Sequence, residues 1–172
     1  MMSFINAECG LAIAKTKFVY LNHGAYGVVF VDKEAEKIIK VFIRSKDKDE
    51  DHVQKVFNAE VDAYCRAKLS PDVLKIIPGN FMRYEKEVKV VDGLGMDVTS
   101  GFYPNFAYST DYVRGHFFKF SGLQGSNASN VRALFKSVGI DFTADMSVTV
   151  DDSNNILKAV DFATEEYVLS HR

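Results

Sequence analysis

A glycine-containing turn with the sequence NHGAYGVV, residues 22–29, is the first stretch of the chain whose residue types could do chemistry. Gly24 and Gly27 have no side chains, so backbone N–H groups beside them can approach an anion such as a phosphate closely. Val29 could pack against a flat base, and Asn22 tolerates the positive φ that glycine usually adopts. A plain β-hairpin also needs glycine in its turn, so the pattern alone leaves both interpretations open.

Lys40 and Glu60 carry charge at positions where apolar residues are expected. Lys40 interrupts an apolar strand, and an ammonium group turned toward the core needs an anionic partner because burying an unpaired charge is costly. Glu60 follows Phe57 by three residues and precedes Val61, so it lies on or beside the apolar stripe of a helix. A lysine that faces solvent is the alternative for Lys40. Together the two residues suit each other as an ion pair.

The hydrophobic pattern predicts the elements that must position these residues. Short β-branched and aromatic runs predict strands, and apolar spacings of three and four predict helices. Ser126 or Asn127 could cap the second helix, and Gly139 could end it. The predicted strands are residues 18–21, 28–31 and 37–43, which form an antiparallel meander, then 87–91, 106–113, and a hairpin of 148–150 and 156–160; the predicted helices are 51–68 and 127–138.

In this order, the glycine turn, the strand lysine and the helix glutamate resemble the N-terminal lobe of a protein kinase. The resemblance implies ATP as cofactor, with Lys40 on the α- and β-phosphates and Glu60 holding it. Residues 110–115 (TDYVRG) resemble the hinge that receives adenine, and residues 159–163 (AVDFA) resemble the D-F-G segment, which gives Asp161 as the magnesium ligand. The implied nucleotide-binding residues are Asn22, Gly24, Gly27, Val29, Lys40, Asp111 and Val113.

The segment that corresponds to the catalytic loop departs from the kinase pattern, because it has neither the His nor the Arg of H-R-D. Asp145, just before the predicted strand 148–150, is the better candidate for the catalytic base, and Asp141 competes with it. Both also flank a helix end, as structural carboxylates do. No Asn follows Asp145 at the family spacing, so Asn154 and Asn155 are the candidates for a metal-binding amide, although both fit a simple turn better.

The length of 172 residues predicts a single α+β domain of kinase-like fold. An N-lobe of about residues 1–110 would hold the antiparallel sheet and one helix, and residues 111–172 would form a much reduced helical C-lobe. The chain ends nine residues after Ala163, before any A-P-E segment. In this it resembles the minimal kinases that bacteria deliver into host cells, including the type that phosphorylates the host ninety-kilodalton heat-shock chaperone. The resemblance implies a Ser/Thr-protein kinase with a host protein as substrate.

Composition excludes several other classes of protein. Hydrophobic residues make up 47% and the net charge is −2, so neither a disordered chain nor a nucleic-acid-binding protein is indicated. No apolar run is long enough to cross a membrane and no cleavable signal is visible, so we expect a cytoplasmic protein, or one secreted into the host cytoplasm without such a signal. Cys9 and Cys65 lack metal spacing and are expected to be buried thiols.

Two other functions remain open. The missing H-R, the missing Asn and the Ala163 of D-F-A favour a pseudokinase that uses the fold to bind proteins. A small-molecule phosphotransferase would share the same ATP-binding parts and would also lack A-P-E.

Overall fold

The computed structural model describes residues 10–123 and 126–167, and they form an α+β protein with two compact units. The first unit consists of residues 10–57 and 80–112, and the second consists of residues 58–79 and the described residues from 113 onward. The boundary after Tyr112 lies close to the expected lobe boundary at residue 110. Residues 58–79, which we expected in the N-lobe, belong to the second unit.

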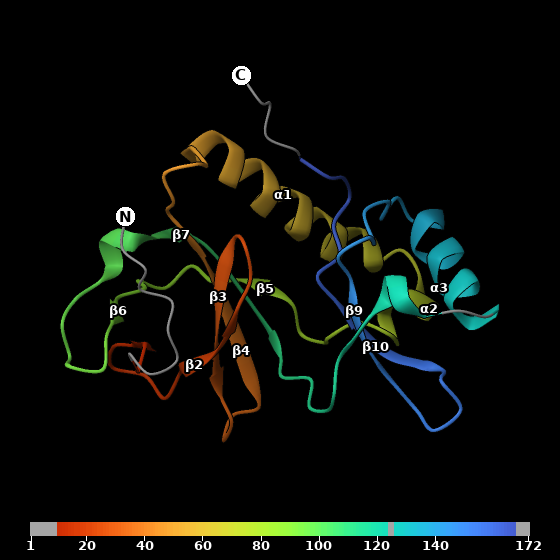
Figure 1. Cartoon of the computed structure of the whole chain (residues 1–172), viewed down its shortest axis with the longest axis horizontal. Helices are drawn as coiled ribbons and strands as arrows, with labels where there is room; N and C mark the ends of the chain where they lie inside the picture. The colour runs from red at the N-terminus through yellow and green to blue at the C-terminus, as the bar shows by residue number, and fades with distance from the viewer. Residues whose placement is uncertain (1–9, 124–125, 168–172) are drawn as a thin grey trace. The chain divides into compact units, whose positions relative to one another are not determined.

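Among the described residues of the first unit, seven strands form one antiparallel sheet (Figure 1). The order across the sheet is β5-β7-β4-β3-β2-β1-β6. The bounds are β1 (Ala12–Ile13), β2 (Val19–His23), β3 (Gly27–Asp32), β4 (Lys37–Ile43), β5 (Met82–Arg83), β6 (Val90–Val91) and β7 (Phe102–Asp111), with a 3-10 turn at Thr99–Gly101 before β7. The predicted meander is confirmed as β2, β3 and β4.

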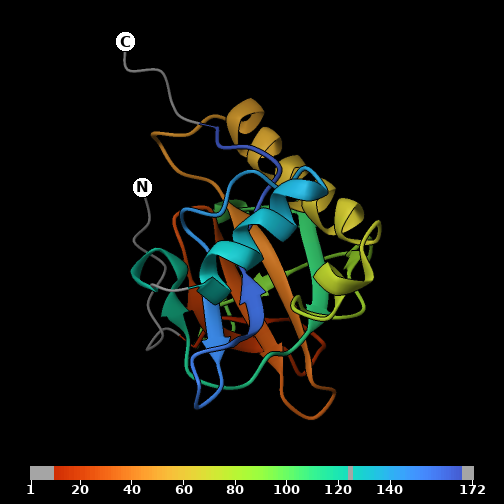
Figure 2. The same ribbon diagram turned by 90° about the vertical axis from the view of Figure 1, so that its right-hand side faces the viewer.

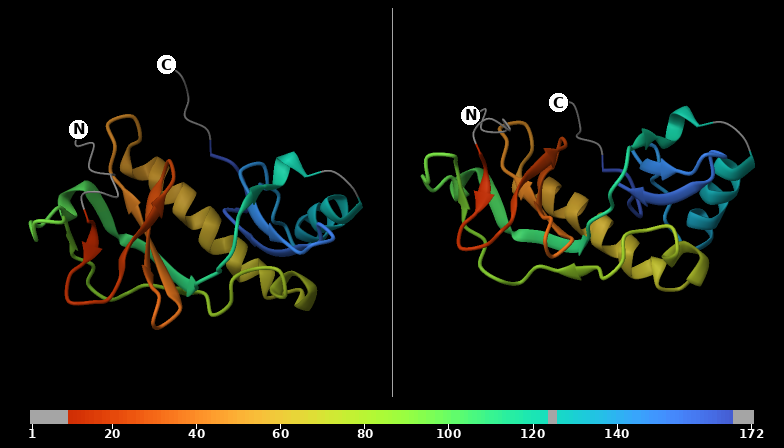
Figure 3. Two further views of the ribbon diagram at one scale, coloured as in Figure 1. Left: turned by 60° about the horizontal axis from the view of Figure 1, so that its bottom comes forward. Right: turned by 90° about the horizontal axis from the view of Figure 1, so that it is seen from below.

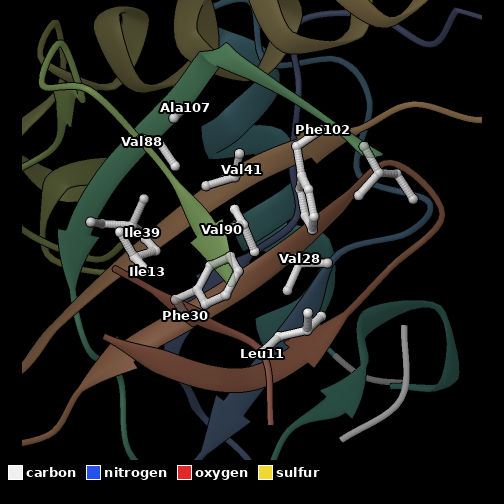
Figure 4. Close-up of a cluster of buried hydrophobic side chains, with 11 residues drawn as sticks. Leu11, Ile13, Val28, Phe30, Ile39, Val41, Val88, Val90, Phe102 and Ala107 are labelled. Atoms are coloured by element: carbon white, nitrogen blue, oxygen red, sulfur yellow. The ribbon is translucent and has the colours of Figure 1, made fainter. Parts of the chain in front are cut away.

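The main hydrophobic core of the first unit covers one face of this sheet (Figure 4). Alternate residues of the central strands point into it, as the period of two in a strand requires. The fully buried side chains include Val28 and Phe30 of β3, Ile39 and Val41 of β4, and Phe102 of β7.

The opposite face of the sheet packs against the start of α1 (Glu50–Ala67), which Figure 3 shows from two sides. Phe57 carries this contact: its ring lies 5.3 Å from that of Phe42 and 5.4 Å from that of Phe106, measured between ring centroids. Asp49 caps the helix, because its carboxylate accepts from the backbone N–H of His52 at 2.8 Å. The predicted helix 51–68 is confirmed to within one residue at each end.

The second unit combines a small antiparallel sheet of order β10-β9-β8 with helices (Figure 2). Its elements after the end of α1 are α2 (Pro71–Leu74), β8 (Phe118–Lys119), a 3-10 turn at Phe120–Gly122, α3 (Ser126–Ser137), β9 (Ser147–Val150) and β10 (Ile156–Val160). From residue 113 onward, the described residues contain one α-helix, α3. This part of the chain is therefore less helical than we expected of a C-lobe.

The predicted hairpin and second helix are confirmed in the second unit. Gly139 ends α3 as predicted: its φ of 83° lies in the left-handed region, and the next N–H, of Ile140, reaches back to the Phe135 carbonyl at 3.0 Å. The prediction that Asn127 could cap this helix is wrong. Asn127 lies inside α3, and its side-chain oxygen accepts instead from the backbone N–H of Ile156 in β10, at 2.9 Å.

Other predictions need correction. The strand expected at 87–91 is limited to Val90–Val91, and the strand expected at 106–113 runs from Phe102 to Asp111. Cys65 is exposed rather than buried, and Cys9 lies outside the described residues. Within the described part of the chain, no helix combines the length and the apolar character that crossing a membrane requires.

Candidate functional site

The glycine turn is a short hairpin whose tip consists of residues 24–27. The N–H of Gly24 donates to the carbonyl of Gly27 at 2.9 Å and closes the turn. β2 continues to His23, so Asn22 pairs with Val29 across the β2–β3 ladder and its φ is not positive. The expectation that Asn22 replaces a glycine of the loop through a positive φ is therefore wrong: strand pairing holds it extended.

Gly27 is a glycine because the side chain of Lys40 passes next to it. A Cβ atom at Gly27 would lie 3.1 Å from Cε and 3.3 Å from Cγ of Lys40, and 3.1 Å from the Val41 carbonyl oxygen. A Cβ atom at Gly24 would meet nothing within 4 Å. The two glycines of the tip therefore differ: Gly27 admits the lysine side chain, whereas Gly24 lies open.

The strand β4 presents Lys40 on the face that α1 packs against. Lys40 pairs with Val29 of β3 and Tyr108 of β7, and its ammonium nitrogen lies 5.0 Å from the centroid of the Phe42 ring. Its neighbours Ile39 and Val41 point into the core on the other face. Lys40 is half-buried, so it is not a solvated surface lysine.

Asp111 and Val113 lie at the end of the first unit and the start of the second. The Asp111 carboxylate accepts from the Lys37 ammonium with one oxygen and from the Asn80 side-chain amide with the other, at 2.8 Å for the second bond. The Tyr112 N–H donates to the Glu36 carbonyl at 2.8 Å. The side chain of Asp111 thus holds the end of β7 within the first unit.

In the second unit, the β9–β10 hairpin brings Asp145 and Asp161 to the same end. Its last pair is Ser147 opposite Val160, so Asp145 precedes the ladder and Asp161 follows it at that end. Both side chains are exposed. Asp161 has a φ of 63°, in the left-handed region, which Asp tolerates better than most residues.

The D-F-A segment, residues 161–163, is held in place by backbone hydrogen bonds of Ala163 and by the packing of the Phe162 ring. Ala163 exchanges two backbone hydrogen bonds with Phe142, at 3.0 and 3.1 Å, and the Asp141 N–H donates to Thr164 at 3.4 Å. The Phe162 ring packs between those of Tyr64, at 4.9 Å, and Phe135, at 5.5 Å. Asp141 therefore lies opposite the residue after Ala163, whereas Asp145 lies in the turn that leads into β9.

Glu60, Tyr64 and Asp161 form a cluster around a buried hydroxyl. Burial raises the pKa of Tyr64 above its ordinary value of 10.0, and the carboxylates of Asp161 and Glu60 add to that shift. Glu60 lies one helical turn before Tyr64 on α1 and is itself buried. Sequence reasoning missed Tyr64, although its spacing of four from Glu60 is visible in the sequence.

Asn154 and Asn155 lie in the turn between β9 and β10, at the opposite end of the hairpin from Asp161. A strand of five residues spans roughly 16 Å at about 3.3 Å per residue. Neither amide can share a metal with Asp161 at that separation. The Asp151 carboxylate instead accepts a hydrogen bond from the Asn155 backbone N–H. This bond lowers the pKa of Asp151 below its ordinary value.

The described residues contain no cluster of three or more His, Cys, Asp or Glu side chains suited to a metal. Mg²⁺ in nucleotide sites needs only one or two carboxylates, because phosphate oxygens and water complete its six ligands. Asp161, an exposed carboxylate with Asp145 at the same end of the hairpin, fits that requirement.

His52 is a further residue of interest that sequence reasoning did not single out. It is buried at the start of α1, and its Nε2 atom forms a 2.7 Å hydrogen bond with the hydroxyl of Tyr26 in the hairpin tip. Neither the sequence pattern of strand β3 nor the spacing of apolar residues along α1 predicts this contact.

Comparison with known proteins matches no family model, no curated protein and no solved structure to this chain.

Proposed function

We propose that the chain is an ATP- and magnesium-dependent Ser/Thr-protein kinase with a reduced kinase-like fold. The observation that carries this proposal is the contact between Gly27 and Lys40. A glycine turn followed by a strand whose lysine passes under that turn supplies backbone N–H groups and an ammonium group together. Both are groups that bind phosphate.

The residues of the first unit would bind the nucleotide. Lys40 neutralises charge on the α- and β-phosphates, and the hairpin tip supplies N–H donors to them. Val29 pairs with Lys40 across the β3–β4 ladder and offers an apolar surface for a base. The ion pair of Lys40 with Glu60 stays a prediction.

The residues of the second unit would serve the transfer step. Bound to Asp161, magnesium supplies positive charge that stabilises the negative charge on the phosphoryl oxygens. Asp145 accepts or orients the proton of the substrate hydroxyl, which attacks the γ-phosphorus as the bond to the β-phosphate oxygen breaks. The products are ADP and a phosphorylated protein. The exposure of Asp145 and its place beside Asp161 at the hairpin end support this role over Asp141.

The test is transfer of label from γ-labelled ATP, with magnesium, into the proteins of a eukaryotic lysate and into purified ninety-kilodalton heat-shock chaperone. Asp161→Asn keeps the shape of the side chain and removes its charge. Asp152→Asn is the matched control, because Asp152 is an exposed carboxylate in the turn at the other end of the same hairpin. We expect labelled protein bands with the wild type and with Asp152→Asn, and none with Asp161→Asn or Lys40→Met.

Two results would overturn the kinase proposal. One is that no labelled band depends on Asp161, and the other is that label enters only small metabolites, as a small-molecule phosphotransferase would produce.

A second candidate function is a pseudokinase that binds proteins. The position of Asn154 and Asn155, remote from Asp161, favours it, because neither can replace the missing catalytic-loop Asn. MgATP binding seen in a melting experiment, without transfer of label, would support this candidate. Ligand at about 100 times its Kd raises the unfolding free energy of a binder by about 2.7 kcal/mol.

A further inference from the structure

The tip of the glycine hairpin, residues 24–27, is joined to the segment that leads from β4 into α1 by three contacts. The Ile43 N–H donates to the Tyr26 carbonyl at 2.9 Å, and the Lys48 ammonium donates to the Ala25 carbonyl at 3.1 Å. The Tyr26 hydroxyl and His52 Nε2 form a 2.7 Å hydrogen bond. All these residues belong to the first unit.

The side chains that make these contacts are themselves held in place. Lys48 is 16% exposed, and its ammonium also lies 4.8 Å from the centroid of the Tyr26 ring. His52 is 9% exposed and lies in the first turn of α1, where the Asp49 cap fixes its backbone. The Tyr26–His52 bond therefore joins the tip to a capped helix, whereas the other two contacts join it to Ile43 at the end of β4 and to Lys48 just before the helix.

A comparable hydrogen bond in the same hairpin does not reach α1. The Tyr20 hydroxyl and His23 Nδ1 lie 2.6 Å apart, but both residues belong to β2. His23 is exposed, and Tyr20 is half-buried against the core of the first unit. Tyr20 therefore provides a matched control: the same type of bond, in the same hairpin, without the connection to the helix.

Two of the three contacts are hydrogen bonds to backbone carbonyl groups of the tip. A loop that binds phosphate must present N–H groups to the anion, and carbonyl oxygens that turned toward the anion would repel it. The Ala25 and Tyr26 carbonyls accept hydrogen bonds from Lys48 and Ile43. A tip released from these donors would spend part of its time with its peptide groups in orientations that cannot bind phosphate.

We propose that Tyr26, Lys48 and His52 are positioning residues that hold the hairpin tip in the conformation that binds the phosphates of the nucleotide. This inference rests on the proposed ATP-binding function. Because the residues act on the phosphate-binding tip, they strengthen the binding of the triphosphate and leave the binding of the nucleoside unchanged. The apparent Kd of a ligand rises in inverse proportion to the fraction of protein in the competent conformation.

The experiment compares Tyr26→Phe and Lys48→Met with the control Tyr20→Phe. Calorimetry gives the Kd for MgATP and for adenosine, and amide hydrogen exchange of the unliganded protein reports on residues 24–27. We expect the Kd for MgATP to rise about three- to tenfold in both variants, as the competent fraction falls to between about a third and a tenth. The Kd for adenosine stays within twofold, exchange at the tip becomes faster, and Tyr20→Phe behaves as the wild type.

A further pair of variants separates positioning from simple loss of packing. His52→Ala removes the partner of Tyr26, whereas His52→Gln keeps an amide nitrogen near the position of Nε2. We expect His52→Gln to restore most of the MgATP affinity that His52→Ala loses.

Two results overturn the inference while the proposed function stands. In the first, the wild type binds MgATP and the Kd for MgATP is unchanged in Tyr26→Phe and Lys48→Met. In the second, these variants bind MgATP and adenosine more weakly by the same factor. A wild type that binds no MgATP overturns the proposed function itself, and with it the phosphate role of these residues.

Discussion

The clearest prediction for a single residue concerns the two glycines of the hairpin tip. A methyl group at Gly27 would press on Lys40 and on the Val41 carbonyl, whereas a methyl group at Gly24 would enter open space. Overpacking of this kind costs about 1–3 kcal/mol. We expect Gly27→Ala to lower the free energy of unfolding by about 1–2 kcal/mol and to weaken MgATP binding by displacing the lysine. Chemical denaturation and calorimetry measure the two effects.

Gly24→Ala is the control, because the φ of Gly24 is not positive and nothing contacts the added methyl group. We expect its stability to stay within about 0.5 kcal/mol of the wild type. Equal destabilisation by both substitutions would contradict the role given to Gly27.

Tyr64 gives a prediction about alkaline pH. Burial, with Asp161 and Glu60 nearby, raises the pKa of its hydroxyl in the folded chain above 10.0, while the unfolded chain keeps the ordinary value. The resulting stability is fully present below pH 10 and is lost as the pH rises toward the pKa of the folded state. The loss amounts to about 1.4 kcal/mol per pH unit.

We expect the unfolding free energy of Tyr64→Phe to fall less steeply than that of the wild type between pH 10 and pH 11. Urea denaturation at several pH values measures the two slopes, and Tyr20→Phe, which removes an exposed hydroxyl, should follow the wild type. Parallel slopes for Tyr64→Phe and the wild type would show that its hydroxyl ionises as in water.

Residue types and spacing singled out Lys40 and Glu60, because charge stands out against an apolar strand or helix face. Asp161 came instead from the resemblance of residues 159–163 to the D-F-G segment, and the roles of all three residues stay predictions. Spacing did not reveal that Gly27 and Lys40 touch, since the contact depends on the register of β3 against β4. It also did not reveal that both carboxylate oxygens of Asp111 bind other residues of the first unit.

Among the elements, the link between α3 and the β9–β10 hairpin can be tested through one side chain. The Asn127 oxygen accepts from the Ile156 N–H, so Asn127→Ala would leave a partly buried backbone donor without its partner. Such a loss costs about 1–3 kcal/mol. We expect denaturation at a lower urea concentration for Asn127→Ala.

Asn130→Ala is the matched control, since Asn130 has an exposed side chain on the same helix. It should change the urea midpoint little. If the two variants shifted it equally, the effect would come from helix propensity and not from the link to β10.

Longer elements were predictable because α1 and α3 repeat their apolar spacing over several turns, and the strands of the meander and the hairpin are runs of β-branched and aromatic residues. β1, β5, β6 and β8 have two residues each and α2 has four, which is too short for a period. Their conformation depends on partners elsewhere in the chain, as when Ala12 pairs with both Val19 and Val91.

At the scale of the whole molecule, neither unit is a continuous stretch of chain. The division falls within α1, after Phe57, and residues 58–79 belong with residues from 113 onward. Their hydrogen-bond partners lie there as well: Ala159 donates to the Ile76 carbonyl at 2.7 Å, and Thr164 donates to the Ala59 carbonyl at 3.1 Å. From the sequence alone we predicted a single lobe boundary near residue 110.

A fragment of residues 1–112 should therefore fail to fold cleanly. Without the second half of the chain, the buried side chains of residues 58–79 lose their cover, among them Ala63, Tyr64 and Ile77. We expect this fragment to bind the dye ANS strongly and to lack a cooperative melting transition, as expanded states with exposed apolar surface do. The full chain should bind little dye and melt cooperatively. A fragment that melts cooperatively would show that residues 58–79 do not depend on the second half.

The left-handed backbone of Asp161 sets stability against the proposed phosphoryl transfer at one position. Glycine, or asparagine, adopts a φ of 63° at least as easily as aspartate does, but neither carries a carboxylate. A library selected for heat resistance alone would drift toward those residues at position 161, while selection for phosphoryl transfer would keep the acid. The residue recovered under each regime would then report whether evolution has retained Asp161 for its charge or for its shape.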